Sequence, residues 1–194
     1  LLDEGKDEEY MISAWEIPRE WGFLENVIGE YSSPMELNML AHLLQNQEIN
    51  REAVSAYAMA MRDQDMITEI EMGNLLLQSE EIPYYHYDFN GMETADFSEE
   101  EKYGYTIAKN NGLRSQLQQM GIDNYMDYEA YGRDTAINEN AYLGRNGYLD
   151  TRSAEKMDLN RYSKGELYTE AGVELPDEIR QKEEEREIDI LLKL

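Results

Sequence analysis

The chain has 194 residues, of which 42 are Asp or Glu and 17 are Lys or Arg, so its formal net charge at pH 7 is -25. A surface this acidic repels nucleic acid and anionic lipid and attracts basic surfaces, which argues against a direct nucleic-acid binder. The sequence has no cysteine, which excludes disulfides, thiol catalysis and cysteine-ligated metals, and no apolar run approaches the roughly 20 residues that span a bilayer.

The first half of the chain predicts a leading strand and then helices. Residues 9–17 are rich in β-favouring side chains and predict a strand that ends before Pro18. Ser33, Pro34 and Glu36 predict a helix start with a capping box. An apolar stripe at helical spacing follows this start. Its members are Leu37, Leu40, Ala41 and Leu44.

Two more helices are expected next. Asn50 is a candidate cap for the second helix, and a third covers about residues 65–76, with an interruption at Gly73. Three short helices in succession favour a small antiparallel bundle. The residues of the second helix expected to face inward are Val54, Tyr57, Ala58 and Met61.

The second half mixes extended and helical segments. Residues 82–89 are predicted to be extended, and Ser98 with Glu101 forms a second capping-box pattern, opening a helix that ends near residues 111–112. Residues 113–120 add further helical turns, and residues 141–149 predict a β-hairpin around Asn146 and Gly147. Residues 152–175 are polar and expected to be irregular, and a charged helix is expected from Pro176.

These elements predict an α+β protein of elongated shape, with a small helical bundle, an α+β domain containing a hairpin, and a C-terminal helix. We expect an acidic, mainly helical domain over residues 1–80, an α+β domain over residues 81–151, and a polar extension over residues 152–194.

The negative charge is concentrated in one block. Residues 20–101 hold eighteen acids and only two bases, Arg51 and Arg62. Apolar residues alternate with the acids, which favours a folded, negatively charged face over a disordered tail. The acids of this predicted face are Glu20, Glu25, Glu30, Glu36, Glu48, Glu52, Asp63, Asp65, Glu69, Glu71, Glu80, Glu81, Asp88, Glu93, Asp96, Glu99, Glu100 and Glu101.

Catalytic motifs are absent from the sequence. His42 and His86 have no metal-binding spacing, and the loop from Asp88 to Glu99 has Glu93 where a calcium loop needs glycine. There is no glycine-rich phosphate loop and no GxSxG. A catalytic carboxylate pair stays open, but 42 acids supply many accidental pairs. We therefore expect no enzyme, no cofactor and no metal.

A folded array of separated carboxylates can imitate a nucleic acid. B-DNA carries about one negative charge per 1.7 Å of its axis. Acids on successive helical turns stand about 5.4 Å apart and can approximate the phosphates of one strand. Such a surface would enter a DNA-binding groove and exclude DNA from it.

The stretch YMDYEAYGRD at residues 125–134 resembles the signature of the ArdA-type antirestriction proteins, whose members carry a YxDYxAYGRD run. The segments EEYMISAWEIP, SSPMELNMLAHLL and EEKYGYTIAKNNG, and the predicted hairpin, are similar to other family landmarks in the same order. The resemblance covers roughly residues 8–150. From the resemblance we expect that the β-rich N-terminal domain usual in the family is absent or truncated here, and that residues 152–194 extend beyond the usual end.

The resemblance implies an elongated homodimer that mimics bent B-form DNA, binds no nucleic acid itself and acts in the cytoplasm. It would occupy the DNA groove of type I restriction–modification enzymes, on their methyltransferase core, and protect incoming mobile DNA such as conjugative transposons. The alternative is an acidic interaction module or decoy for another basic DNA-binding protein.

The resemblance also places the signature at or near a dimer interface. Tyr125, Tyr128 and Tyr131 would then anchor the interface, although tyrosines that fill the core are an equal alternative. Gly132 would allow a close approach or an unusual turn, and Arg133 would pair with an acid. The candidate signature residues are Tyr125, Asp127, Tyr128, Glu129, Tyr131, Gly132, Arg133 and Asp134.

Overall fold

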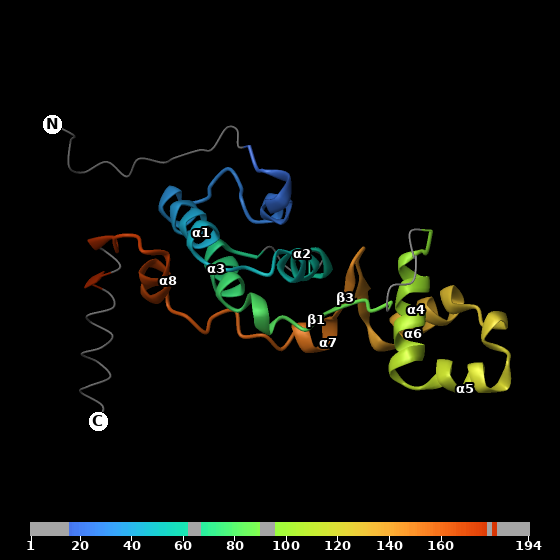
Figure 1. Ribbon diagram of the computed structural model, residues 1–194. Coiled ribbons are helices and arrows are strands. Elements are labelled where there is room, and N and C mark those ends of the chain that lie inside the picture. The colour runs from blue at the N-terminus through green and yellow to red at the C-terminus, as the bar shows by residue number, and fades with distance from the viewer. Residues whose placement is uncertain (1–15, 62–66, 90–95, 178–179, 182–194) are drawn as a thin grey trace, which may run out of the picture. The chain divides into compact units, whose positions relative to one another are not determined.

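The computed structural model describes residues 16–61, 67–89, 96–177 and 180–181, apart from the side chains of Glu20 and Asn26. The chain forms two compact units. The first unit comprises Leu1–Ala58, Arg62–Glu80 and Asp158–Leu194, and the second comprises Met59–Met61 and Glu81–Met157. Helices and one small antiparallel sheet confirm the α+β class (Figure 1). Among the described residues, no helix is long and apolar enough to cross a membrane.

The three predicted helices are present. They are α1 (Pro34–Asn46), α2 (Arg51–Ala60) and α3 (Glu69–Leu77), with short 3-10 segments η1 (Arg19–Asn26) and η2 (Ser79–Glu81) on either side. Asn50 caps α2 by accepting a hydrogen bond from the backbone of Ala53 at 3.1 Å. All four inward positions predicted for this segment are buried. Gly73 does not interrupt α3, and residues 9–15 of the predicted leading strand lie outside the described residues.

Helix α1 is apolar on more than one side, so the single apolar stripe predicted from the sequence describes only part of its apolar surface. The fully buried face is Met39, Leu40 and Leu43, on a helix that packs against α3 and α8 (Lys164–Ala171). All four stripe residues, Leu37, Leu40, Ala41 and Leu44, line a shallow apolar groove together with η1. Ala41 is exposed. The prediction of one stripe was incomplete because α1 is covered from two directions.

The predicted capping boxes formed only in part. The Ser33 and Ser98 hydroxyls each accept a hydrogen bond from a helix backbone N–H, as expected. The Glu36 carboxylate contacts the ammonium of Lys164 instead of closing its box, because an opposite charge is a stronger partner than a backbone N–H. Complete boxes form at two starts that the sequence analysis did not predict, Thr68 before α3 and Ser163 before α8.

The prediction that residues 152–175 are irregular was wrong. This stretch contains α7 (Thr151–Ala154) and α8, whose Leu167, Tyr168 and Ala171 are buried. Figure 1 shows α8 beside α1 in the first unit. The Asn74 side chain holds the chain before α8, donating to the carbonyl of Tyr162 at 3.1 Å and accepting from its N–H at 2.7 Å. Most of the helix predicted from Pro176 lies outside the described residues.

The sheet belongs to the second unit. Its strands are β1 (Tyr84–His86), β2 (Ala141–Leu143) and β3 (Gly147–Asp150), in the antiparallel order β1-β3-β2. The predicted hairpin is β2–β3, but its turn covers residues 144–146 and Gly147 is already paired in β3. A methyl group on Gly147 would lie 2.4 Å from the carbonyl oxygen of Tyr85, so this glycine serves the close approach of β1 and not a two-residue turn.

The largest helix contact of the second unit is the crossing of α4 (Glu99–Asn110) and α6 (Tyr128–Glu139). Between these helices lie α5 (Leu113–Met120) and the 3-10 turn η3 (Asp123–Tyr125). Glycine stands on both sides of the crossing. A methyl group on Gly104 would lie 2.0 Å from the carbonyl oxygen of Tyr128, and one on Gly132 would lie 1.9 Å from that of Glu100. The two backbones therefore touch directly.

Replacing Gly132 by alanine should destabilise the second unit. The added methyl group meets backbone that cannot rotate away, so we expect a loss near the top of the usual overpacking range, about 3 kcal/mol. Urea unfolding followed by far-ultraviolet circular dichroism measures this loss. Gly22→Ala is the control, since nothing lies within 4 Å of its added methyl group. Equal stabilities for the two variants would contradict the crossing as described.

Candidate interaction surface

The acids of the predicted acidic face lie at the surface wherever their side chains are described, although not all are fully exposed. Fourteen of the eighteen acids have described side chains, and none of the fourteen is buried. Nine are exposed: Glu25, Glu30, Glu48, Glu52, Glu80, Glu81, Asp88, Asp96 and Glu99. Five are half-buried: Glu36, Glu69, Glu71, Glu100 and Glu101. The side chains of Glu20, Asp63, Asp65 and Glu93 lie outside the described part.

Glu36, Asp88 and Glu71 are among the acids that make local contacts. Glu36, whose side chain is 16% exposed, pairs with Lys164. Asp88 pairs with Lys109 at 2.7 Å. Glu71 accepts a hydrogen bond from the backbone of Thr68 at 2.9 Å, completing the cap of α3. A partner that binds these carboxylates would have to replace contacts that they already make.

Acids gather where the α4–α6 crossing brings two helix starts together. Glu101 lies in the first turn of α4, Asp127 caps α6, and Glu129 lies in the first turn of α6. Burial, followed by the charges of Glu129 and Asp127, raises the pKa of the Glu101 carboxyl. The positive ends of both helix dipoles offset part of this repulsion. The fold therefore keeps these three carboxylates closer together than their mutual repulsion would otherwise allow.

Glu101→Gln should stabilise the protein at neutral pH. Because the pKa of Glu101 is raised above its ordinary value of 4.5 in the folded state, its charged form is penalised there. The penalty is absent below about pH 4, where the carboxyl is protonated in both states, and complete above the raised pKa. We expect Tm to rise by about 1–3 °C at pH 7, since a close like-charge pair costs about 0.2–0.5 kcal/mol.

Thermal unfolding at pH 7 and pH 3.5 measures the effect of Glu101→Gln. Glu25→Gln removes an exposed acid from outside this cluster and should change Tm little at either pH. A Glu101→Gln variant less stable than the parent at pH 7, or one with the same gain at pH 3.5, would contradict the repulsion.

The signature tyrosines have three different environments. The Tyr128 hydroxyl donates to the carboxylate of Asp123, and burial, followed by that bond, raises the pKa of Tyr128 to about 12. The Arg114 guanidinium approaches the same carboxylate at 3.9 Å and lies 4.3 Å from the ring centre of Tyr105. Tyr128 therefore belongs to a network inside the second unit, which agrees with the core alternative for this residue.

Tyr131 and Tyr125 differ from Tyr128. Tyr131 is half-buried, and its hydroxyl accepts a hydrogen bond from the side chain of Asn111 at 3.0 Å. Tyr125 is 87% exposed. Of the three tyrosines, Tyr125 is the one most available to another molecule.

The polar signature residues are divided between structural and surface positions. Asp127 caps α6 by accepting from the backbone of Ala130 at 2.9 Å, and Gly132 makes its close approach to α4 of the same chain. Glu129 is exposed. Arg133 and Asp134 are exposed neighbours with Nε and Oδ1 4.0 Å apart.

Sequence reasoning missed an apolar corner next to the signature. Met120 at the end of α5 is 69% exposed, and Ile122 before η3 is 38% exposed. With Tyr125 they place three large apolar side chains in solvent within six residues, which we call the α5–η3 corner. Helix α5 has no buried residue. The helical turns expected for this segment are present, but the sequence did not indicate what they would pack against.

The histidines and acids reveal no metal centre in the part of the chain that is described. No group of three or more potential ligands occurs there, and residues 90–95 of the calcium-loop-like stretch lie outside it. His42 is half-buried on α1, and the His86 ring lies edge-on to Tyr84 with centroids 5.2 Å apart.

The family model described as antirestriction protein (ArdA) matches residues 2–150, about three quarters of the chain. No curated protein and no solved structure matches the chain.

Proposed function

This chain belongs to the ArdA family of antirestriction proteins, and we propose that it acts as a DNA mimic. In this proposal it occupies the DNA-binding groove of type I restriction–modification enzymes, on their methyltransferase core, and protects incoming mobile DNA. It would act in the cytoplasm, where those enzymes meet that DNA.

One observation supports the proposal above the others: none of the fourteen described acids of the predicted face is buried. Exposed carboxylates on a folded unit keep their charge and, within that unit, their approximate spacing, as phosphates on a duplex do. Most of the bases lie elsewhere in the sequence, since residues 63–101 contain twelve acids and no Lys or Arg. A basic groove would meet negative charge with few cations to oppose it.

A second candidate function uses the same surface on a different target. An acidic decoy for another basic DNA-binding protein needs the same exposed carboxylates but no restriction enzyme. A pull-down from a bacterial lysate separates the two, because the mimic should retain methyltransferase subunits and the decoy should retain other proteins.

Competition binding tests the proposal directly. The chain should displace DNA from a type I methyltransferase core, and its affinity should fall between 50 and 200 mM salt, since charged contacts of this kind are screened. No displacement at either salt concentration would reject the mimic.

Neutralising mimic acids should weaken this competition. In the variant Glu25→Gln, Glu30→Gln and Glu48→Gln, three exposed carboxylates of the first unit are lost. We expect roughly tenfold weaker competition at low salt and a shallower dependence of affinity on salt.

A matched variant distinguishes the effect of where the acids lie from the effect of net charge. Glu170→Gln, Glu174→Gln and Asp177→Asn also removes three exposed acids of the first unit, from outside the predicted face. Asp177 already faces Arg180 at 3.2 Å. This variant should compete almost as well as the parent, and equal losses for the two variants would mean that only net charge matters.

We further propose that the chain forms a homodimer through the α5–η3 corner. Tyr and Met are enriched at protein interfaces, and exposed apolar clusters mark interaction sites. Tyr125 and Met120 supply both residue types at that corner. Tyr128 and Tyr131 then support the interface from inside the second unit and do not form it.

Charges placed at the corner should break the dimer. We expect Met120→Glu with Tyr125→Glu to be monomeric at concentrations where the parent is dimeric, in sedimentation-velocity measurements. Tyr31→Glu with Met35→Glu is the matched control, because these side chains are 84% and 50% exposed in the first unit. A monomeric parent, or a corner variant that stays dimeric, would contradict this interface.

A further inference from the structure

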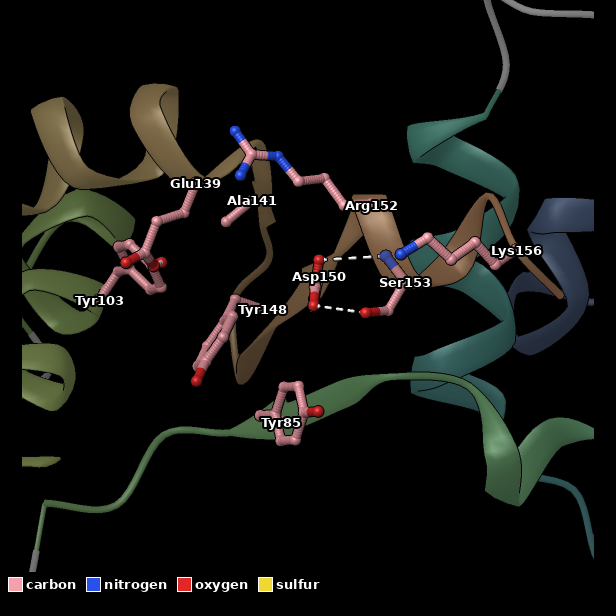
Figure 2. Close-up of a pocket in the computed structure, with 9 residues that line it drawn as sticks. All are labelled: Tyr85, Tyr103, Glu139, Ala141, Tyr148, Asp150, Arg152, Ser153 and Lys156. Atoms are coloured by element: carbon pink, nitrogen blue, oxygen red, sulfur yellow. Dashed lines mark hydrogen bonds between the residues drawn. The ribbon is translucent and has the colours of Figure 1, made fainter.

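The second unit contains a pocket that the mimic surface does not use. Its volume is about 530 Å³, within the range of about 300–1,000 Å³ typical of small-molecule sites. Figure 2 shows Tyr85 and Tyr148 on one side of Asp150, Arg152 and Lys156 on its other sides, and Glu139 farther away beside Tyr103. All nine lining residues belong to the second unit.

The aromatic wall is formed by neighbouring strands. Tyr85 of β1 stands opposite Tyr148 of β3 in the sheet, and their ring centroids are 5.3 Å apart at an angle of 33°. Tyr85 is 50% exposed, so part of its ring is open to another molecule. A planar aromatic group stacks favourably on such a ring.

The pocket's carboxylates are largely committed to the fold. Both oxygens of Asp150 accept hydrogen bonds from Ser153, one from the backbone N–H at 3.2 Å and one from the hydroxyl at 2.7 Å (Figure 2). Glu139 accepts from the Tyr103 hydroxyl at 2.7 Å. These bonds reduce the capacity of both acids to bind a cationic ligand.

The two cations of the pocket make fewer contacts within the fold than its two carboxylates do. Arg152 donates through one guanidinium nitrogen to the carbonyl of Asn138 at 2.7 Å, which fixes the group while its other N–H donors remain available. Lys156 is exposed, and the described residues give its ammonium no ion pair. Two cations beside an aromatic wall suit an anionic group attached to a planar ring.

We propose that this pocket binds a nucleoside phosphate, with the base stacked on Tyr85 and the phosphate held by Arg152 and Lys156. A single nucleotide brings only one or two negative charges, so the acidic protein repels it far less than a duplex. At about 150 mM salt the Debye length is about 8 Å, which screens the distant acids. The two acids of the pocket itself, Glu139 and Asp150, are already hydrogen-bonded within the fold.

Isothermal titration calorimetry with adenosine 5′-monophosphate at 150 mM salt tests the site on the full chain. We expect binding that is weaker for adenosine and weaker for inorganic phosphate, because each lacks one of the two contacts. No heat of binding with the monophosphate overturns the proposal. Inorganic phosphate binding as tightly as the monophosphate overturns the stacking on Tyr85.

Variants assign the binding to these residues. Lys156→Gln and Arg152→Gln should each weaken binding about tenfold, since hydrogen bonds to charged groups are the strong ones. Lys156→Gln changes an exposed side chain, so its fold should be intact by circular dichroism. Arg145→Gln is the control, an exposed cation in the β2–β3 turn outside the pocket. Unchanged binding in both pocket variants, or equal weakening in the control, overturns the site.

Discussion

Direct backbone contact between α4 and α6, which glycine allows on both helices, determines most of what surrounds the signature. With any other residue at Gly104 or Gly132, a methyl group would lie within about 2 Å of a carbonyl oxygen on the other helix. The contact places the start of α6 beside the start of α4, and α6 leads through Asn140, which has a positive φ of 57°, directly into β2. The acidic cluster and the sheet therefore both depend on the two glycines.

The same crossing creates a conflict between stability and charge. It brings Glu101 close to Asp127 and Glu129, and the pKa of Glu101 rises as a result of burial and of their charges. A protein selected only for stability would avoid this cluster, whereas a surface that imitates phosphates needs it. The cost is offset within the second unit by helix dipoles and by the network that joins Tyr128 to Asp123.

Local signals were sufficient for much of the fold. The helix starts at Ser33, Asn50 and Ser98 depend on residues three positions apart, and all three caps formed. Contacts between distant residues could not be predicted in this way. Lys164 pairs with Glu36 across 128 positions of the chain, and this pair removed Glu36 from its expected capping box. Burial of α8 depends on α1 and α3, so its polar sequence was mistaken for an irregular segment.

The sequence predicted the type of candidate site, but not the environment of each residue in it. Charge distribution predicted an acidic face, and none of its described acids is buried. The signature identified the family, but a motif does not state which tyrosine faces inward. Tyr128 and Tyr125 are three residues apart but lie in different environments, because Tyr128 packs on Tyr105 whereas Tyr125 is the exposed last residue of the short turn η3.

The central claim is that these carboxylates occupy the positions of DNA phosphates on the enzyme. A cryo-electron microscopy structure of the chain bound to a type I methyltransferase core tests it most directly. The account predicts Glu25, Glu48 and Glu99 within salt-bridge distance of the Lys and Arg side chains that hold phosphates in the DNA complex. A complex in which those carboxylates face solvent, with the DNA groove empty, would contradict it.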